Sequence, residues 1–196
     1  MKIGIPCEDG PFLALENPLI DAEKLYALID ENRSFLSQWL PWAENETLAD
    51  LKQFMAYGAN EFAKGKAANF LIYDHGELVG KISLKDMIFQ QKAEIGYFLK
   101  QSATGKGIMT RAVRVITTLA FQEYQVQRLV IKAAQAMENA LRNMTLTQAW
   151  ALELIYSAAE LFCFIGQTIA VQRLVKDAHY GWLLLENKLI IARLND

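Results

Sequence analysis

The sequence predicts an α/β fold in which helices flank one mixed sheet within a single domain. Apolar residues recur at helical spacing in two N-terminal segments, and from residue 69 the pattern changes to the short alternating runs typical of strands. A strand, a glycine-rich loop, a helix and another strand then follow one another. This order is typical of a mixed α/β sheet, and a chain of 196 residues is long enough to bury one core.

Two helices are expected before the first predicted strand. Residues 19–40 carry apolar side chains at helical spacing, with Asp21 as a candidate N-cap. Pro41 stops this helix, because proline disfavours helical backbone in the residue before it. Residues 47–65 begin with a threonine and, three residues later, an aspartate, which is a capping-box-like arrangement at the start of a second helix.

The strands are expected in the second half of the pattern. Residues 69–84 read as two short strands around a His-Gly turn, which is a hairpin signal. Residues 92–99 predict another strand, 110–124 a helix and 127–134 the strand that follows it. The C-terminal stretch 178–194 reads as one or two strands, so the predicted single domain includes the whole chain.

Composition and charge exclude several classes of protein. The net charge of −2 argues against a direct nucleic-acid partner, because that function usually shows a basic surplus. Cys7 and Cys163 are too few and too isolated for a metal cluster or a disulfide framework. The N-terminus lacks a long apolar run, so no secretory signal is expected. We therefore expect a reduced cytoplasmic protein without a metal.

One apolar stretch, residues 144–165, is long enough to span a bilayer. It contains Gln148, Glu153 and Glu160, and each acidic group near the bilayer centre would cost about 3 kcal/mol. We therefore expect a buried or subunit-facing helix and no membrane partner. The same apolar character is the basis for expecting a homodimer.

A glycine-rich loop, "ATGKGIMT", connects the strand at 92–99 to the following helix. A Walker A loop fails because Lys100 stands where its first glycine is needed and Gly107 where Ser or Thr is needed. A dinucleotide fingerprint fails because Thr110 occupies the place of its third glycine. A glycine-rich turn at a helix N-terminus can still hold a pyrophosphate. From the glycines alone, an ordinary strand-to-helix turn remains an equal alternative.

The flanking residues narrow these alternatives. The stretch "KAEIGYFLKQSATGKGIMTRAV", residues 92–113, resembles the acetyl-CoA-binding core of the GNAT N-acetyltransferases. It is most similar to the branch that acetylates the N-termini of ribosomal proteins. Residues 21–42, 76–84 and 127–134 resemble further blocks of that branch in the same order. The resemblance implies a mixed, mostly antiparallel sheet that is splayed at the acetyl-CoA site.

The resemblance also implies which residues hold the coenzyme. Backbone amides of residues 105–109 would hold the coenzyme A pyrophosphate, and the strand end at 97–99 would splay at a bulge, bind the pantetheine arm and polarise the thioester carbonyl. Thr104 departs from the family, which prefers Gln or Arg there. The implied cofactor-binding residues are Tyr97, Phe98, Leu99, Thr104, Gly105, Lys106, Gly107, Ile108, Met109, Thr110 and Asn139.

Catalytic groups are less completely indicated. The family pattern implies that Glu94 is the base that deprotonates the incoming ammonium, and the alternative is a salt-bridged strand glutamate. The family's Asn-x-x-Ser pattern, which supplies a proton donor, is missing: Asn139 aligns, but Arg142 or Ala140 takes the serine position. Residues 135–178 depart from the family throughout.

Trp39 and Trp42 resemble aromatics that lie near the substrate cleft, where they would bind the acceptor; the alternative is core or lid packing. The predicted function is transfer of an acetyl group from acetyl-CoA, a co-substrate, to a primary amine, above all a protein N-terminal α-amino group. Two alternatives stay open at this point. One is an acetyltransferase for a small amine such as a polyamine or amino sugar, and the other is an acetyl-CoA-binding module with weak or no turnover.

Overall fold

The computed structural model describes residues 2–8, 10–132, 180–185 and 188–193. The described strands are β1 (Gly4–Pro6), β2 (Phe12–Leu15), β3 (Ala68–Asp74), β4 (Glu77–Ile88), β5 (Lys92–Leu99), β6 (Arg128–Lys132), β7 (Tyr180–Leu185) and β8 (Lys188–Arg193). The described helices are α1 (Pro18–Glu31), α2 (Arg33–Leu36), α3 (Leu48–Ala63) and α4 (Ile108–Gln122), with the 3-10 turns η1 (Pro41–Glu44) and η2 (Gln101–Ala103).

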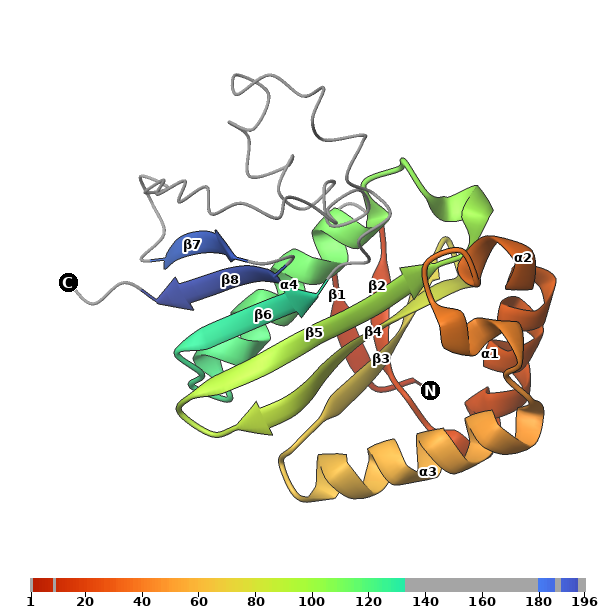
Figure 1. Ribbon diagram of the computed structural model, residues 1–196, viewed down its shortest axis with the longest axis horizontal. Coiled ribbons are helices and arrows are strands. Elements are labelled where there is room, and N and C mark those ends of the chain that lie inside the picture. The colour runs from red at the N-terminus through yellow and green to blue at the C-terminus, as the bar shows by residue number, and fades with distance from the viewer. Residues whose placement is uncertain (1, 9, 133–179, 186–187, 194–196) are drawn as a thin grey trace.

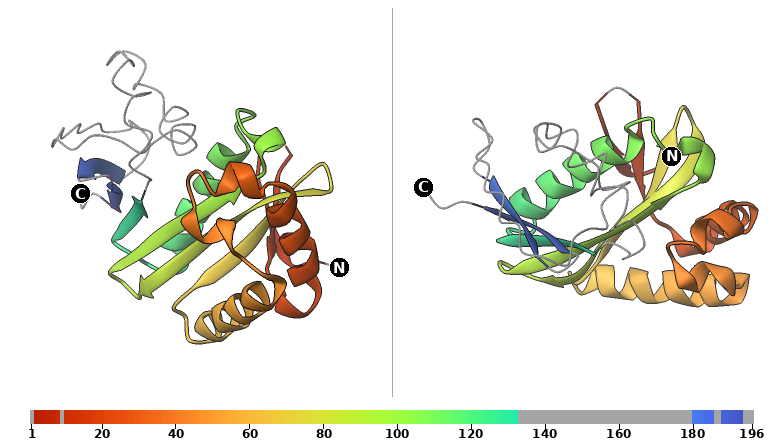
Figure 2. Two further views of the ribbon diagram at one scale, coloured as in Figure 1. Left: turned by 45° about the vertical axis from the view of Figure 1, so that its right-hand side comes forward. Right: turned by 45° about the horizontal axis from the view of Figure 1, so that its top comes forward.

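These strands form one sheet in the order β1-β2-β3-β4-β5-β6-β8-β7 (Figure 1). Strands β5 and β6 are the parallel pair, and every other neighbouring pair is antiparallel. Helix α4 covers one face of the sheet, whereas α1 and α3 cover the other (Figure 2). The predicted mixed, mostly antiparallel sheet with flanking helices is therefore confirmed.

The first helix begins earlier than predicted, and Asp21 is not its N-cap. Asn17 is the N-cap, and its side chain accepts a hydrogen bond from the Leu19 amide at 3.0 Å. The Asn17 amide in turn donates to Asp21 Oδ2 at 3.0 Å, so Asp21 completes a reciprocal cap from the first turn. Pro18 at the first helical position favours this earlier start. The helix ends at Glu31, short of the predicted residue 40.

The second helix and the hairpin agree with the sequence prediction. The Thr47 side chain caps α3 and accepts a hydrogen bond from the Asp50 amide at 3.2 Å. Strands β3 and β4 are joined by His75 and Gly76, which have φ angles of 46° and 83°. Two consecutive positive φ angles are typical of a two-residue hairpin turn.

Strands β1 and β2 were not predicted from the sequence. They have three and four residues, which is too short for a two-residue period to stand out. They extend the sheet because β2 pairs with β3 in antiparallel register, with Leu13 opposite Ile72 and Leu15 opposite Phe70. The sheet decides their conformation, since short strands form when a neighbouring edge is available.

Side-chain alternation along β5 distributes residues between two cores. Ala93, Ile95 and Leu99 pack with α4 in one buried cluster, while Phe98 packs with the cluster under α1 and α3. Successive strand residues point to opposite faces. Glu94 therefore lies on the face that α1 and α3 cover.

Some predictions fall on residues 133–179, which lie outside the described residues. They include the site residue Asn139, the divergent stretch 135–178 and the apolar stretch 144–165. The expected single domain over 1–196 and the expected homodimer therefore stay predictions. Within the described part of the chain, no helix is both long and apolar enough to cross a membrane.

Candidate active site

The glycine-rich loop leads from η2 into the N-terminus of α4. Gly107 is the N-cap of α4, with a φ angle of 69° and no side-chain cap, and Gly105 has a φ angle of 71°. These left-handed conformations favour glycine. The first amides of a helix have no partner within it, and the helix dipole adds positive charge there. The loop therefore has the geometry of an anion-binding site.

Three side chains of this segment, those of Thr104, Ile108 and Met109, are engaged within the protein. Ile108 and Met109 are fully buried under the sheet, so they can offer a ligand only their backbone amides. The Thr104 hydroxyl donates to the Gln101 carbonyl at 2.8 Å and closes the η2 turn. Thr104 thus has a local structural use at the position where the family prefers a longer polar residue.

The last parallel pair described between β5 and β6 is Ile95 with Ile131, whereas β5 continues to Leu99 against β4 (Figure 1). The described part of β6 ends at Lys132, so the predicted splay of these two strands stays a prediction. The bulge expected at residues 97–99 does not lie between β5 and β4, because the register shift of that pair falls at Lys85 and Ile88.

A cavity of about 1010 Å³ lies between the sheet and the helices α1 and α3. Trp42 from η1 and Phe98 from β5 both line it, with ring centroids 5.8 Å apart in an edge-to-face arrangement. Trp39 is half-buried and is not among the residues that line the cavity. The structure thus places one of the two predicted tryptophans at the cavity, where Trp42 of η1 contacts Phe98 of β5.

Glu94 forms an ion pair with Lys85, the residue opposite it on β4. Lys85 Nζ lies 2.8 Å from Glu94 Oε1, and Glu94 is 8 % exposed. Gly96 permits this pair, because a Cβ there would lie 3.2 Å from Lys85 Cε. The carboxylate is therefore held in place on β5, at the residue that pairs with Val130 of β6. The sequence indicated Glu94 but gave no sign of Lys85.

A second ion pair involves Lys81, which lines the same cavity. Lys81 on β4 pairs with Glu16, and their side chains are 7 % and 3 % exposed. Burial raises the pKa of Glu16, and the Lys81 charge partly opposes this shift. The Lys81 ammonium also lies 5.2 Å from the centre of the Phe54 ring. Sequence reasoning missed both members, because they are 65 positions apart and carry no motif.

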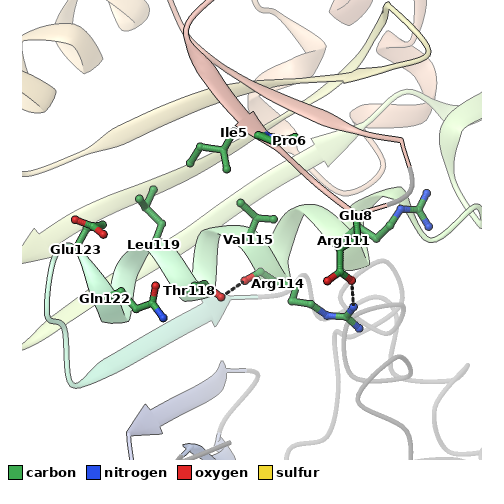
Figure 3. Close-up of a pocket in the computed structure, with 10 residues that line it drawn as sticks. All are labelled: Ile5, Pro6, Glu8, Arg111, Arg114, Val115, Thr118, Leu119, Gln122 and Glu123. Atoms are coloured by element: carbon green, nitrogen blue, oxygen red, sulfur yellow. Dashed lines mark hydrogen bonds and ion pairs between the residues drawn. The ribbon is translucent and has the colours of Figure 1, made fainter.

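A smaller pocket of about 390 Å³ lies along α4 and the N-terminal hairpin (Figure 3). Arg111 and Arg114 line it from the first turns of α4, and Arg114 Nη1 pairs with Glu8 Oε2 at 3.4 Å. Arg111 donates from Nη2 to the Lys106 carbonyl at 3.3 Å. These two side chains add positive charge beside the glycine-rich loop, which strengthens its attraction for an anion.

The part of the chain that the structure describes contains no group of three His, Cys, Asp or Glu side chains that could hold a metal ion. The groups that this site offers to a reaction are backbone donors and the positioned carboxylate of Glu94.

Comparison with known proteins identifies this arrangement. The family described as Acetyltransferase (GNAT) domain matches residues 13–145. The chain belongs to the GNAT acetyltransferase family. This confirms the predicted family and enzyme class, and it extends the match beyond the blocks seen in the sequence.

Two relatives of this GNAT acetyltransferase come from well-studied bacteria. The chain is 39 % identical over 125 residues to "Putative ribosomal N-acetyltransferase YdaF" of Bacillus subtilis, covering 61 % of this chain and 67 % of the relative. It is 32 % identical over 125 residues to the ribosomal-protein-serine acetyltransferase of Escherichia coli, covering 61 % and 70 %. Both belong to the branch that the sequence resembles.

Solved structures agree with the GNAT fold. A structure described as a probable acetyltransferase is 31 % identical, with a TM-score of 0.63 over 71 % of this chain and 79 % of its own. The ribosomal L7/L12 alpha-N-protein acetyltransferase RimL, solved in complex with coenzyme A, has a TM-score of 0.67 over 99 % of both chains. At 20 % identity, this second likeness shows the fold alone.

Proposed function

We propose that this GNAT acetyltransferase transfers the acetyl group of acetyl-CoA to the α-amino group at the N-terminus of a protein. The observation that carries the proposal is the meeting of three features along β5. The strand carries Glu94 in its ion pair with Lys85, the N-terminus of α4 lies beyond its end without a side-chain cap, and the cavity lined by Trp42 and Phe98 lies on one of its faces. The relatives named for ribosomal-protein acetylation support the choice of acceptor.

The donor side of the reaction uses backbone groups. The amides of Gly105, Lys106 and Gly107, with those of Ile108 and Met109, bind the pyrophosphate, and Thr110 follows in the first turn of α4. The backbone of Tyr97, Phe98 and Leu99 binds the pantetheine arm and polarises the thioester carbonyl. Hydrogen bonds to a carbonyl oxygen favour the tetrahedral transition state, because charge develops on that oxygen.

The acceptor side uses the cavity and Glu94. A volume of about 1010 Å³ admits the first residues of an extended peptide, and its aromatic wall at Trp42 and Phe98 gives them an apolar contact. A terminal α-amino group has a pKa of about 8, so it loses its proton readily near neutral pH. Glu94, held by Lys85, accepts the ammonium proton directly or through one water.

The reaction is tested by measuring thiol release from acetyl-CoA with a panel of amines. We expect release with a peptide whose N-terminus is free, none with its N-acetylated form, and much less with a polyamine or an amino sugar. Preference for a small amine would replace the proposed acceptor. Tight acetyl-CoA binding without thiol release for any amine would overturn the enzyme in favour of a binding module.

The Glu94 assignment has its own test. We expect Glu94→Gln to lower kcat by about 100-fold or more, because a general base contributes at least that factor. Glu77→Gln is the matched control, since Glu77 lies on β4 with a side chain 69 % exposed and pairs with Lys100. An unimpaired Glu94→Gln enzyme would show that another group takes the proton.

We also infer a cytoplasmic location and a second copy of the chain as partner. The location follows from the ribosomal-protein acceptors named for the relatives, which are made in the cytoplasm. Sedimentation of the purified protein tests self-association, and a sharp monomer would end that part of the proposal.

A further inference from the structure

The segment between α2 and α3 is fixed by one arginine. Arg33 donates from Nη1 to the Ala43 and Glu44 carbonyls at 2.6 and 3.0 Å, and from Nη2 to the Glu46 carbonyl at 3.0 Å. Asp30 holds the same guanidinium through Nη2 at 2.7 Å. A guanidinium that satisfies three carbonyls of one short segment gives that segment a single conformation.

The fixed segment presents Trp42 and Glu46 to the cavity. The Glu46 carboxylate makes no hydrogen bond or ion pair with any described residue, and its side chain is half-buried. Burial raises its pKa, and the nearby Asp50 carboxylate raises it further, while Arg33 and Lys81 act in the opposite direction. The charged groups that face Glu46 are therefore Arg33 on α2, Asp50 on α3 and Lys81 on β4.

Lys81 lies on the opposite wall of the cavity, on β4. Its side chain is only 7 % exposed, and Glu16 is its charge partner. An ammonium has three hydrogens, and Lys81 Nζ makes no further hydrogen bond within the described chain. A buried donor that lines a cavity and keeps spare hydrogens favours a ligand with an acceptor oxygen.

We propose that Glu46 and Lys81 together recognise an α-aminoacyl group, with Glu46 binding its ammonium and Lys81 donating to its carbonyl. This inference rests on the proposed function and names the chemistry of its acceptor. A peptide N-terminus carries a cation and a carbonyl oxygen only three bonds apart (N–Cα, Cα–C and C=O), which suits groups of opposite character on facing walls. Trp42 supports the cation, because aromatic rings attract ammonium groups.

The same pair predicts that a simple amine is a poor acceptor. A polyamine has the ammonium that Glu46 binds, but it lacks a carbonyl, so the buried Lys81 donors stay without a partner. Leaving a buried charged donor such as Lys81 without a hydrogen-bond acceptor is unfavourable. This cost arises when a simple amine binds and not when a peptide binds. Recognition of both groups therefore gives specificity for peptides.

The test compares two ligands and two variants in the full-length chain. The ligands are a tetrapeptide amide with a free N-terminal serine and n-butylamine, which has an ammonium but no carbonyl. Kd is measured by calorimetry with coenzyme A present, and KM by thiol release. The calorimetric readout does not require turnover, so a failure of the proposed function and a failure of this inference are distinguishable.

We expect Glu46→Gln to raise Kd and KM for both ligands about 10-fold, with kcat changed less than about threefold, because hydrogen bonds to charged groups are worth roughly that factor or more. Glu44→Gln is the matched control: Glu44 is an exposed glutamate of the same segment that does not line the cavity. Wild-type Kd in Glu46→Gln would overturn the assignment of Glu46.

Lys81 is tested in the double variant Lys81→Met/Glu16→Gln, which removes the buried pair without leaving a lone charge. We expect Kd for the peptide to rise about 10-fold and Kd for n-butylamine to stay unchanged. Equal changes for the two ligands, or no change for the peptide, would overturn the role of Lys81.

Discussion

The buried pair of Glu16 and Lys81 should dominate the stability of the cavity wall. Lys81→Met removes the cation and leaves Glu16, which is 3 % exposed, without its counterion. Removing one partner of a buried ion pair typically destabilises a protein by about 3–5 kcal/mol. Since domains of this kind are stable by about 5–15 kcal/mol, this variant should lose a large fraction of its free energy of unfolding.

The loss should depend on pH in a defined direction. Burial raises the pKa of Glu16, and Lys81 lowers it, so removal of Lys81 lets the pKa of the folded state rise further. The folded variant then binds a proton more tightly than the unfolded chain does. The destabilisation by the lone Glu16 carboxylate is absent below the pKa of Glu16 in the unfolded chain and complete above its pKa in the folded variant. The stability of the variant therefore falls as pH rises from the first pKa to the second.

Urea denaturation followed by circular dichroism measures these free energies. We expect the free energy of unfolding of Lys81→Met to fall below that of wild type by less at about pH 5.5 than at about pH 8. The double variant Lys81→Met/Glu16→Gln should regain most of the loss, because no lone charge remains. Lys52→Met is the control, since its pair with Glu23 is exposed, and it should change stability by less than about 1 kcal/mol. Equal losses in the single and double variants, independent of pH, would refute the reasoning.

Two further predictions concern the glycine-rich loop and the N-terminal hairpin. Gly107→Ala should weaken coenzyme A binding about 5- to 10-fold by calorimetry, because a left-handed conformation is unfavourable for alanine by about 1–2 kcal/mol and its Cβ would lie 3.1 Å from Arg111 Nη1. Gly65→Ala has the same φ of 69° away from the loop and should leave coenzyme A affinity unchanged; equal effects would contradict a role for the loop backbone. Burial raises the pKa of Cys7 from 9.0 to about 11, so the folded thiol keeps its proton where the unfolded thiol has lost it. Stability should therefore fall by at most about 2 kcal/mol more in wild type than in Cys7→Ala as pH rises from about 9 to 11, measured by urea denaturation, and parallel pH curves would count against this assignment.

Local sequence was sufficient for the elements whose determinants lie within a few residues. The cap of α3 at Thr47, the turn at His75 and the bounds of β5 all agree with it. The predicted start of α1 disagrees with the structure, because Asn17 and Asp21 cap the helix jointly and either residue type is a good N-cap. Strands β1 and β2 were missed because β2 forms against the edge of β3 and β1 forms against β2.

The sequence by itself determined the family, the loop that suits a pyrophosphate and the strand that carries Glu94. Motifs of this kind are contiguous, so their chemistry can be recognised without a fold. The tertiary structure alone decided which charges meet: Lys85 with Glu94, Lys81 with Glu16, and Glu46 across the cavity from Lys81. These pairings depend on strand register and on which helices cover which face of the sheet. Both are set by long-range packing, because a strand's alternation fixes two faces but does not say what covers either one.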